Sequence, residues 1–159
     1  LYVDKVRLPN GHILPEHHFF EFGNGSVCAV MEDGRKRILL IRLYRYPSDS
    51  MEWELPAGRM EDGETSLEAV QREVLEETGY RAVHYEEILN YYPVNGISNH
   101  RMYLFRCQAA QKAGSFDPQE VTEVRWFEKD EILTMIRGKK IMDGLSLTGL
   151  LYYFQFSSQ

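Results

Sequence analysis

Apolar residues along most of the chain come in short runs separated by glycine, proline and charged residues, a pattern typical of β-strands. These runs predict strands over residues 26–31, 38–44, 51–55, 82–92, 102–109 and 121–127. Ahead of them, the extended stretches 1–8 and 14–22 flank Asn10-Gly11, a dipeptide favoured in hairpin turns. Residues 1–22 are therefore predicted to form a β-hairpin extension that precedes the main body.

The strongest helix signal covers residues 65–77. Thr65 and Glu68 have the spacing of a capping box at its start. Its apolar residues recur at helical spacing and predict one stripe facing the core: Leu67, Val70 and Val74. Two further helices are predicted over 130–137 and 146–156. The resulting order of strands and helices indicates an α/β or α+β sandwich with a mixed sheet.

Composition narrows the class of protein. The 159 residues are 43% hydrophobic with a net charge of −6. This balance fits one compact domain and argues against non-specific binding to nucleic acid, which requires a basic surface. No apolar run reaches the roughly 18 residues of a membrane span. Cys28 and Cys107 lie in apolar segments, so we expect buried, reduced thiols and a cytoplasmic protein.

Three acidic residues in the predicted helix 65–77 suggest metal chemistry. Glu73, Glu76 and Glu77 stand at i, i+3 and i+4, so on a helix they share one face within about one turn. Like charges at this spacing destabilise a helix, and a divalent cation would relieve their repulsion. Carboxylate oxygens suit Mg²⁺. Taken alone, the three residues favour a solvated acidic helix face over a metal site.

The residues around these acids have a specific spacing. They match the pattern G-x5-E-x7-R-E-U-x-E-E-x-G-U at every fixed position: Gly58, Glu64, Arg72, Glu73, Glu76, Glu77 and Gly79. Tyr80 stands where an aliphatic residue is usual. The segment thus resembles the signature of the Nudix hydrolases. The resemblance implies an α/β/α sandwich over residues 23–159 and hydrolysis of a nucleoside diphosphate linked to a second group.

The resemblance also implies roles for individual residues. Glu73 and Glu77 would hold Mg²⁺ or Mn²⁺, with Glu76 orienting or sharing the metal and the carbonyl of Ala57 as a further ligand. Arg72 and Glu64 would brace the loop against the helix. The run 119–127 resembles the family's E-x-I-E-V-x-W-F, which makes Glu120 the candidate general base. The alternative for Glu120 is a solvated loop acid. Glu123 is a weaker candidate, because strand alternation turns it to the sheet surface.

Residues outside the signature indicate the subfamily. Residues 53–58, W-E-L-P-A-G, resemble a run of the ADP-ribose and nucleotide-sugar pyrophosphatases. Residues 42–45, R-L-Y-R, resemble the R-Q-Y-R segment of the same group. Substrate contacts are therefore expected at four positions: Arg42, Arg45, Trp53 and Glu54. Two arginines can clamp phosphates in a bidentate manner, although an ordinary surface strand remains an alternative for them.

A loop at residues 92–101 resembles Y-P-S-P-G-x-x-x-E-R of the ADP-ribose enzymes, with departures at fixed positions. Asn95 replaces the second proline and His100 replaces the glutamate. His100 and Arg101 are candidate substrate contacts. For His100, the alternative of a loop residue without a role stays open.

These observations favour a cytoplasmic, Mg²⁺-dependent pyrophosphatase that converts ADP-ribose to AMP and ribose 5-phosphate. Another nucleotide-sugar or dinucleotide substrate, such as GDP-mannose, is the enzymatic alternative. A non-catalytic Nudix ligand sensor is the other class, although such proteins tend to lose signature acids that are all present here. By analogy, residues 1–22 are expected to support a homodimer, and neither nucleic acid nor membrane is expected as a partner.

Overall fold

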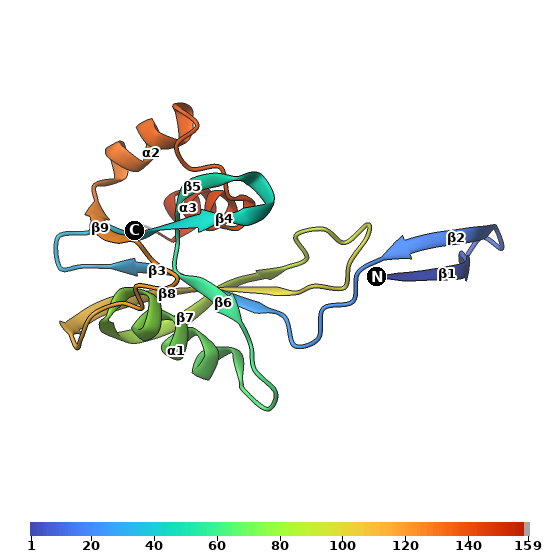
Figure 1. Cartoon of the computed structure of the whole chain (residues 1–159), viewed down its shortest axis with the longest axis horizontal. Coiled ribbons are helices and arrows are strands. Elements are labelled where there is room, and N and C mark those ends of the chain that lie inside the picture. Colours follow the sequence, from blue (N-terminus) through green and yellow to red (C-terminus); the bar gives the residue numbers. More distant parts are fainter. Residues whose placement is uncertain (158–159) are drawn as a thin grey trace.

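The computed structural model describes residues 1–157. Its strands are β1 (Tyr2–Arg7), β2 (Ile13–Phe19), β3 (Ser26–Glu32), β4 (Ile38–Arg45), β5 (Ser50–Glu54), β6 (Ala57–Arg59), β7 (Tyr80–Tyr91), β8 (Met102–Lys112) and β9 (Glu123–Phe127). Its helices are α1 (Ser66–Thr78), α2 (Lys129–Arg137) and α3 (Gly144–Phe156), with a short 3₁₀ helix, η1, at Tyr46–Ser48. Figure 1 shows a body of sheet and helices from which β1 and β2 extend.

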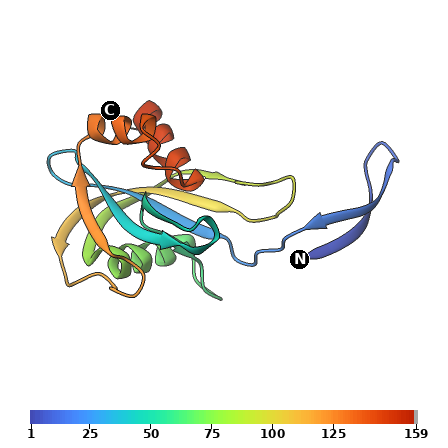
Figure 2. The same cartoon turned by 45° about the horizontal axis from the view of Figure 1, so that its top comes forward.

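A mixed sheet forms the middle layer of the body. Its strand order is β5-β4-β3-β8-β7, with β6 paired to β3 and β9 paired to β4. Strands β3 and β8 run parallel, whereas the other pairs of this sheet are antiparallel. Helix α1 covers one face, and α2 and α3 cover the other (Figure 2). The predicted α/β/α sandwich with a mixed sheet is confirmed.

Two apolar cores fill the spaces between the layers. On β4, Ile41 belongs to the core that contains Val74 of α1. Its neighbour Leu40 belongs to the core that contains Ile132 of α2 and Leu150 of α3. Successive side chains of a strand point to opposite faces, so odd-numbered residues of β4 face α1 and even-numbered residues face α2 and α3. All of β3 is buried because both of its faces are covered.

Strands β3 and β4 separate along their length, and this separation places the site. They share one register pair, Glu32 with Ile38, beside the turn that joins them. Toward its start, β3 pairs with β6 instead, with Cys28 opposite Ala57. The far end of β4 and the short strand β6 therefore lie on two sides of an opening in the sheet.

Helix α1 begins and ends where its local sequence predicts. The Thr65 side chain accepts from the Glu68 backbone N–H, and the Glu68 side chain accepts from the Thr65 backbone, which completes the capping box. Gly79 ends the helix with φ of 71°, a left-handed conformation that favours glycine. The expectation that Leu67 faces the core is wrong, because its side chain is 43% exposed. It lies in the first turn, near the margin of the buried face that contains Val70.

Strand β6 was missed by the sequence pattern. Residues 56–58 read as a turn that closes the preceding strand, but Ala57–Arg59 pair with Ser26–Cys28 of β3. Three residues are too short for an alternation of apolar and polar positions to be visible. The pairing partner lies some thirty residues away in sequence, so no local signal predicts it.

Cys28 and Cys107 are both buried as free thiols, as expected. Burial raises the pKa of the Cys28 thiol well above its usual value and raises the pKa of Cys107 to about 12. Both side chains therefore behave as small apolar core residues.

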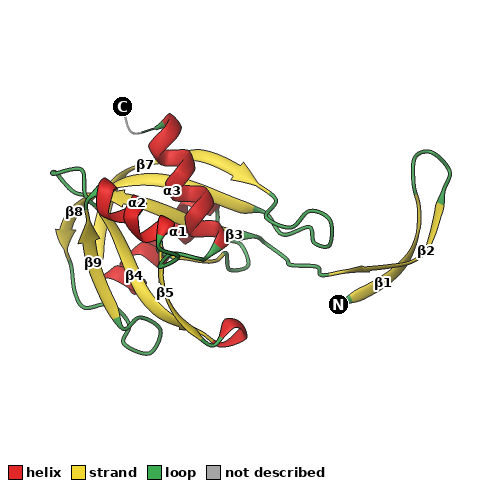
Figure 3. Ribbon diagram, turned by 90° about the horizontal axis from the view of Figure 1, so that it is seen from above, coloured by secondary structure: helices red, strands yellow, loops and turns green. Residues whose placement is uncertain are grey.

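The predicted hairpin extension is formed by β1 and β2, which pair antiparallel in a separate two-stranded sheet. It stands away from the body, as Figures 1 and 3 show. We call residues 1–19 the N-terminal arm. It exposes apolar side chains to solvent: Leu1, Tyr2, Val3 and Ile13. No helix within residues 1–157 is long and apolar enough to span a membrane.

Candidate functional site

An open cleft of about 520 Å³ lies where β4 and β6 diverge, beside α1. The far end of β4, strand β6, α1 and the loop before β9 all contribute to it. Its lining residues are Leu43, Tyr44, Arg45, Ala57, Gly58, Arg59, Glu73, Glu77, Gln119, Glu120 and Thr122. The structure thus brings together residues separated by up to about 80 positions in the sequence.

Glu73 lies directly against Gly58. A Cβ atom built on Gly58 would lie 2.0 Å from both Cδ and Oε1 of Glu73, closer than any real contact. Only glycine therefore allows the carboxylate to occupy this place. Burial raises the pKa of Glu73, and the adjacent Arg72 guanidinium opposes that shift. The first glycine of the motif and its second glutamate are thus sterically coupled.

Glu77 is the most buried acid of the cleft, with an exposed fraction of 7%. Its Oε2 accepts a hydrogen bond from the Ala57 backbone N–H at 2.7 Å. The pKa of Glu77 is raised to about 8, chiefly by burial and also by the negative charges of Glu73 and Glu120. The Ala57 N–H and the Arg45 guanidinium lower it.

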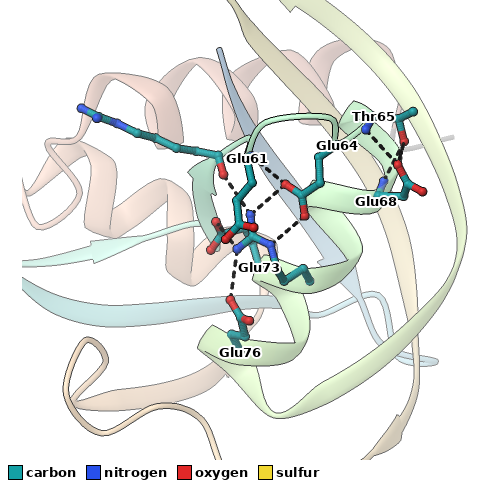
Figure 4. A network of polar contacts seen from close by, with 8 residues as sticks. Glu61, Glu64, Thr65, Glu68, Glu73 and Glu76 are labelled. Atoms are coloured by element: carbon teal, nitrogen blue, oxygen red, sulfur yellow. Dashed lines mark hydrogen bonds and ion pairs between the residues drawn. The ribbon is translucent and has the colours of Figure 1, made fainter. Parts of the chain in front are cut away.

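Arg72 connects the loop before α1 to the acidic face of the helix. Figure 4 labels three of its partners, Glu64, Glu73 and Glu76. Its Nε and Nη2 donate to the two carboxylate oxygens of Glu64 at 2.8 and 3.0 Å. Its Nη1 donates to Glu73 at 2.8 Å and to Glu76 at 3.1 Å, and Nη2 also donates to the carbonyl of Arg59 at 2.9 Å. The pKa of Glu64 falls to about 2, chiefly because of these bonds from Arg72. The pair fixes the loop on the helix.

Glu76 and Glu120 are more accessible than the two buried acids. The Glu76 side chain is 54% exposed and bonds to Arg72. Glu120 is exposed on the loop before β9 and lines the cleft. That loop is attached to the end of α1, because the Asp117 backbone N–H donates to the Glu76 carbonyl at 2.9 Å. Glu120 thereby lines the same cleft as Glu73 and Glu77.

The donor set of the cleft fits a hard divalent cation. Within residues 1–157, no three His, Cys, Asp or Glu side chains already converge as metal ligands. Glu73 and Glu77 nevertheless lie side by side on α1, and burial raises the pKa of both carboxyl groups, although Arg72 pairs with Glu73. Mg²⁺ commonly takes one or two carboxylates and completes its shell with water and substrate phosphate. Two glutamates beside the main chain of Ala57 suffice for that mode.

The expected substrate contacts on β4 and β5 divide between two faces. Arg45 lines the cleft, and its guanidinium donates to both carboxylate oxygens of Glu54 at 2.9 and 2.6 Å. Arg42 lies on the opposite face, with its guanidinium carbon 5.9 Å from the centroid of the Trp53 ring. Trp53 in turn packs edge-on against Phe127, at 4.9 Å between ring centroids. Of the four expected contacts, only Arg45 lines the cleft; Glu54 reaches it through its pairing with Arg45, and Arg42 and Trp53 lie outside the lining.

The loop 92–101 does not line the cleft either. The His100 ring packs edge-on against Phe22, with ring centroids 4.9 Å apart. Its Nδ1 is buried without a hydrogen-bond partner among residues 1–157. Arg101 donates to Asn90 Oδ1 at 2.6 Å, and its guanidinium lies over the Tyr103 ring.

Arg59 is a cleft residue that the sequence analysis did not single out. It stands at a variable position of the motif, so the fixed spacing carries no signal for it. A positive residue directly after the first glycine was the available signal.

Comparisons with known proteins agree with this geometry. The family model described as "NUDIX domain" matches residues 24–145. A "CMP-5'-(N-acetyl-N-hydroxy-3-aminopropyl)phosphonate hydrolase" of Streptomyces rubellomurinus is 34% identical over 94% of this chain and 72% of that protein. An "ADP-ribose pyrophosphatase" of Bacillus subtilis is 27% identical over 96% of this chain and 83% of that protein. A solved structure described as an "ADP compounds hydrolase" shares the fold, with a TM-score of 0.81, 17% identity, and 98% and 91% of the two chains covered.

Proposed function

Because this chain belongs to the Nudix hydrolase family, we propose that it hydrolyses the diphosphate of ADP-ribose to give AMP and ribose 5-phosphate. The observation that carries the proposal is the pair of buried carboxylates, Glu73 and Glu77, in a cleft that Arg45 also lines. Two buried carboxylates can bind a metal ion, and the nearby Arg45 guanidinium can bind phosphate oxygens, so the cleft suits a metal-bound diphosphate.

Glu73 and Glu77 are proposed to hold Mg²⁺ or Mn²⁺, with the Ala57 carbonyl as a further ligand and Glu76 orienting or sharing the metal. A divalent cation supplies Lewis acidity and lowers the pKa of bound water. Arg72 orients the Glu73 carboxylate through its 2.8 Å bond. Glu64 keeps Arg72 in place, so both act on the reaction by positioning Glu73.

Glu120 is proposed as the general base. It is accessible, it lines the cleft, and its charge acts on Glu73 and Glu77. A carboxylate in this place accepts a proton from a water that approaches phosphorus. The loop that carries Glu120 is hydrogen-bonded to the end of α1, and this bond helps to hold Glu120 in place relative to Glu73 and Glu77.

Arg45 is proposed to contact the diphosphate from the β4 side. Its bidentate pairing with Glu54 fixes the guanidinium in one orientation. Arg42, Trp53 and Arg101 lie outside this cleft. Contacts between these residues and the substrate require a substrate group that extends beyond the cleft.

We propose a cytoplasmic homodimer in which the N-terminal arm packs on a second copy. A lone two-stranded hairpin is marginally stable in water. This arm also exposes apolar side chains, including Tyr2 at 51% and Val3 at 52%. Two buried, reduced thiols are compatible with the cytoplasm.

A second candidate is the same chemistry on another nucleotide conjugate. It is favoured by the 34% identity to a protein named as a hydrolase of a CMP-linked phosphonate. The departures at Asn95 and His100 in the loop 92–101 point the same way.

Product analysis separates these candidates. Purified protein with Mg²⁺ is incubated with ADP-ribose, GDP-mannose, UDP-glucose, a diadenosine polyphosphate and dGTP, and the products are resolved by chromatography. AMP released fastest from ADP-ribose supports the proposal. Faster turnover of another conjugate contradicts the proposal and identifies that conjugate as the preferred substrate. Tight binding without turnover of any of them contradicts an enzymatic role.

A further inference from the structure

One arginine of the cleft has no carboxylate partner. Arg45 is paired with Glu54, and Arg72 is paired with the acids of the motif. Within residues 1–157, the Arg59 guanidinium makes neither an ion pair nor a hydrogen bond, although the Arg59 carbonyl accepts from Arg72. In a cleft lined by acids, this side chain carries an unneutralised positive charge.

The position of this charge is set by an aromatic ring. The Arg59 guanidinium carbon lies 5.4 Å from the centroid of the Phe22 ring. A cation over an aromatic face is held in orientation, yet its N–H groups remain available to an anion. The backbone of Arg59 is fixed as well, because it pairs with Ser26 on β3.

Phe22 is itself held from the other side. Its backbone N–H donates to Asn99 Oδ1 at 3.0 Å, and its ring meets the edge of the His100 ring. Two residues earlier, the Phe20 N–H donates to the Ile97 carbonyl at 2.7 Å. The linker between the N-terminal arm and β3 is thereby attached to the loop 92–101. Contacts run continuously from that loop, through Phe22, to the guanidinium of Arg59.

We propose that Arg59 binds the anionic oxygens of the substrate's diphosphate, and that Phe22, backed by His100, positions its guanidinium. This inference rests on the proposed function and adds a substrate-binding residue to it. The acids Glu73, Glu77 and Glu120 repel a polyanion, and Glu54 offsets the charge of Arg45, the other arginine that lines the cleft. Arg59 supplies the free cation that such a ligand requires, with a planar fork that suits phosphate oxygens. His100 then serves the site by supporting Phe22.

The competing explanation is a purely structural contact between Arg59 and the linker. Substitutions that keep shape but alter charge or ring character distinguish the two. Arg59→Met retains an apolar stem over Phe22 without the charge, and Arg59→Lys retains the charge without the fork. Phe22→Leu removes the ring, whereas Phe22→Tyr keeps it. Kinetics with ADP-ribose and Mg²⁺ are measured together with the dissociation constant of α,β-methylene-ADP, whose P–C–P bridge resists hydrolysis.

We expect Arg59→Met to raise both KM and the dissociation constant by about tenfold or more, as for loss of a charge-assisted hydrogen bond. Arg59→Lys should recover part of this loss. Phe22→Leu should raise KM with little change in kcat, and Phe22→Tyr should restore it. The double variant Arg59→Met with Phe22→Leu should bind no more weakly than Arg59→Met alone, because Phe22 acts through Arg59.

Arg125→Met is the matched control. Arg125 also stacks on a phenylalanine, with its guanidinium carbon 4.3 Å from the Phe127 centroid, but it lies outside the cleft. Its KM should equal that of the wild type. An active wild type whose KM and analogue binding are unchanged by Arg59→Met overturns this inference and leaves the proposed function intact. A wild type that hydrolyses no substrate, but binds the analogue through Arg59, supports the inference and overturns the proposed reaction.

Discussion

At the scale of single residues, the motif consists of interlocking side chains. Gly58 provides the space that the Glu73 carboxylate occupies. On one side of Gly58, the Ala57 backbone N–H donates to the Glu77 carboxylate. On the other side, the Arg59 carbonyl accepts from the Arg72 guanidinium. Three consecutive residues of β6 thus each hold a different residue of α1. The fixed spacing of the motif follows from this contact between a strand and a helix.

Gly58→Ala tests the steric coupling. The new Cβ atom would overlap the Glu73 carboxyl group, so either the carboxylate or β6 must move. We expect kcat/KM to fall by about a hundredfold and the free energy of unfolding to fall by about 1–3 kcal/mol, the range for overpacked sites. Gly34→Ala is the control, because nothing lies within 4 Å of a Cβ atom at Gly34. Equal activity of both variants would contradict the coupling.

Glu77 makes a pH-dependent contribution to stability when chelator removes divalent cations. Its pKa rises from 4.5 to about 8 on folding, chiefly through burial. Between these values the folded state holds the proton more tightly, so the free energy of unfolding decreases as pH rises. Glu77→Gln removes the titrating carboxyl group. Urea unfolding in EDTA should therefore show that the free energy of unfolding decreases less between pH 6 and pH 8.5 in the variant than in the wild type. The exposed Glu16→Gln should behave as the wild type, and identical losses in all three proteins would refute the assignment.

At the scale of elements, α1 was predictable because its signals are local. The capping box, the spacing of Val70 and Val74 and the glycine after the last turn lie within fifteen residues of one another. Strand β6 was not predictable, because its partner in β3 is distant in sequence. Arg42 and Arg45 point to opposite faces of the sheet because side chains alternate along a strand and these two residues are three positions apart.

The cleft itself could be predicted only in part. The motif spacing identified the acids and the arginine of α1. The contact between Phe22 and Arg59 joins the linker before β3 to β6. No periodic pattern in the sequence predicts a contact of this kind. The same holds for His100, whose neighbour in the fold is Phe22.

The capping box offers a test at this scale. The Thr65 hydroxyl oxygen accepts from the Glu68 N–H at 3.2 Å at the start of α1. Thr65→Ala leaves that N–H without its side-chain partner, and we expect the free energy of unfolding to fall by about 1 kcal/mol. Urea denaturation measures the change. Thr65→Ser keeps the hydroxyl and should retain most of the stability, whereas equal losses in both variants would show that the cap is not the cause.

At the scale of the whole molecule, the N-terminal arm and the body are distinct. Neither apolar core includes a residue of β1 or β2. The arm meets the body through the linker at residues 20–22, where Phe20 bridges to Ser98. Both apolar cores are therefore formed by residues of the body, and the apolar side chains of the arm are exposed.

Removal of residues 1–19 tests the proposed dimer. Light scattering coupled to size-exclusion chromatography should give a dimer for the full chain and a monomer for the shortened chain. The shortened chain should still unfold cooperatively, because both cores are retained. A full chain that is monomeric at micromolar concentrations, or a shortened chain that remains dimeric, would contradict the proposed role of the arm in dimerisation.

We propose that the buried pair Glu73 and Glu77 supports metal-dependent hydrolysis of a diphosphate. Its most direct test is the rate of AMP release from ADP-ribose with Mg²⁺, compared between the wild type and Glu77→Gln. We expect rapid release by the wild type and a rate lower by orders of magnitude in the variant, whose circular dichroism should be unchanged. Near-normal release by Glu77→Gln would contradict it.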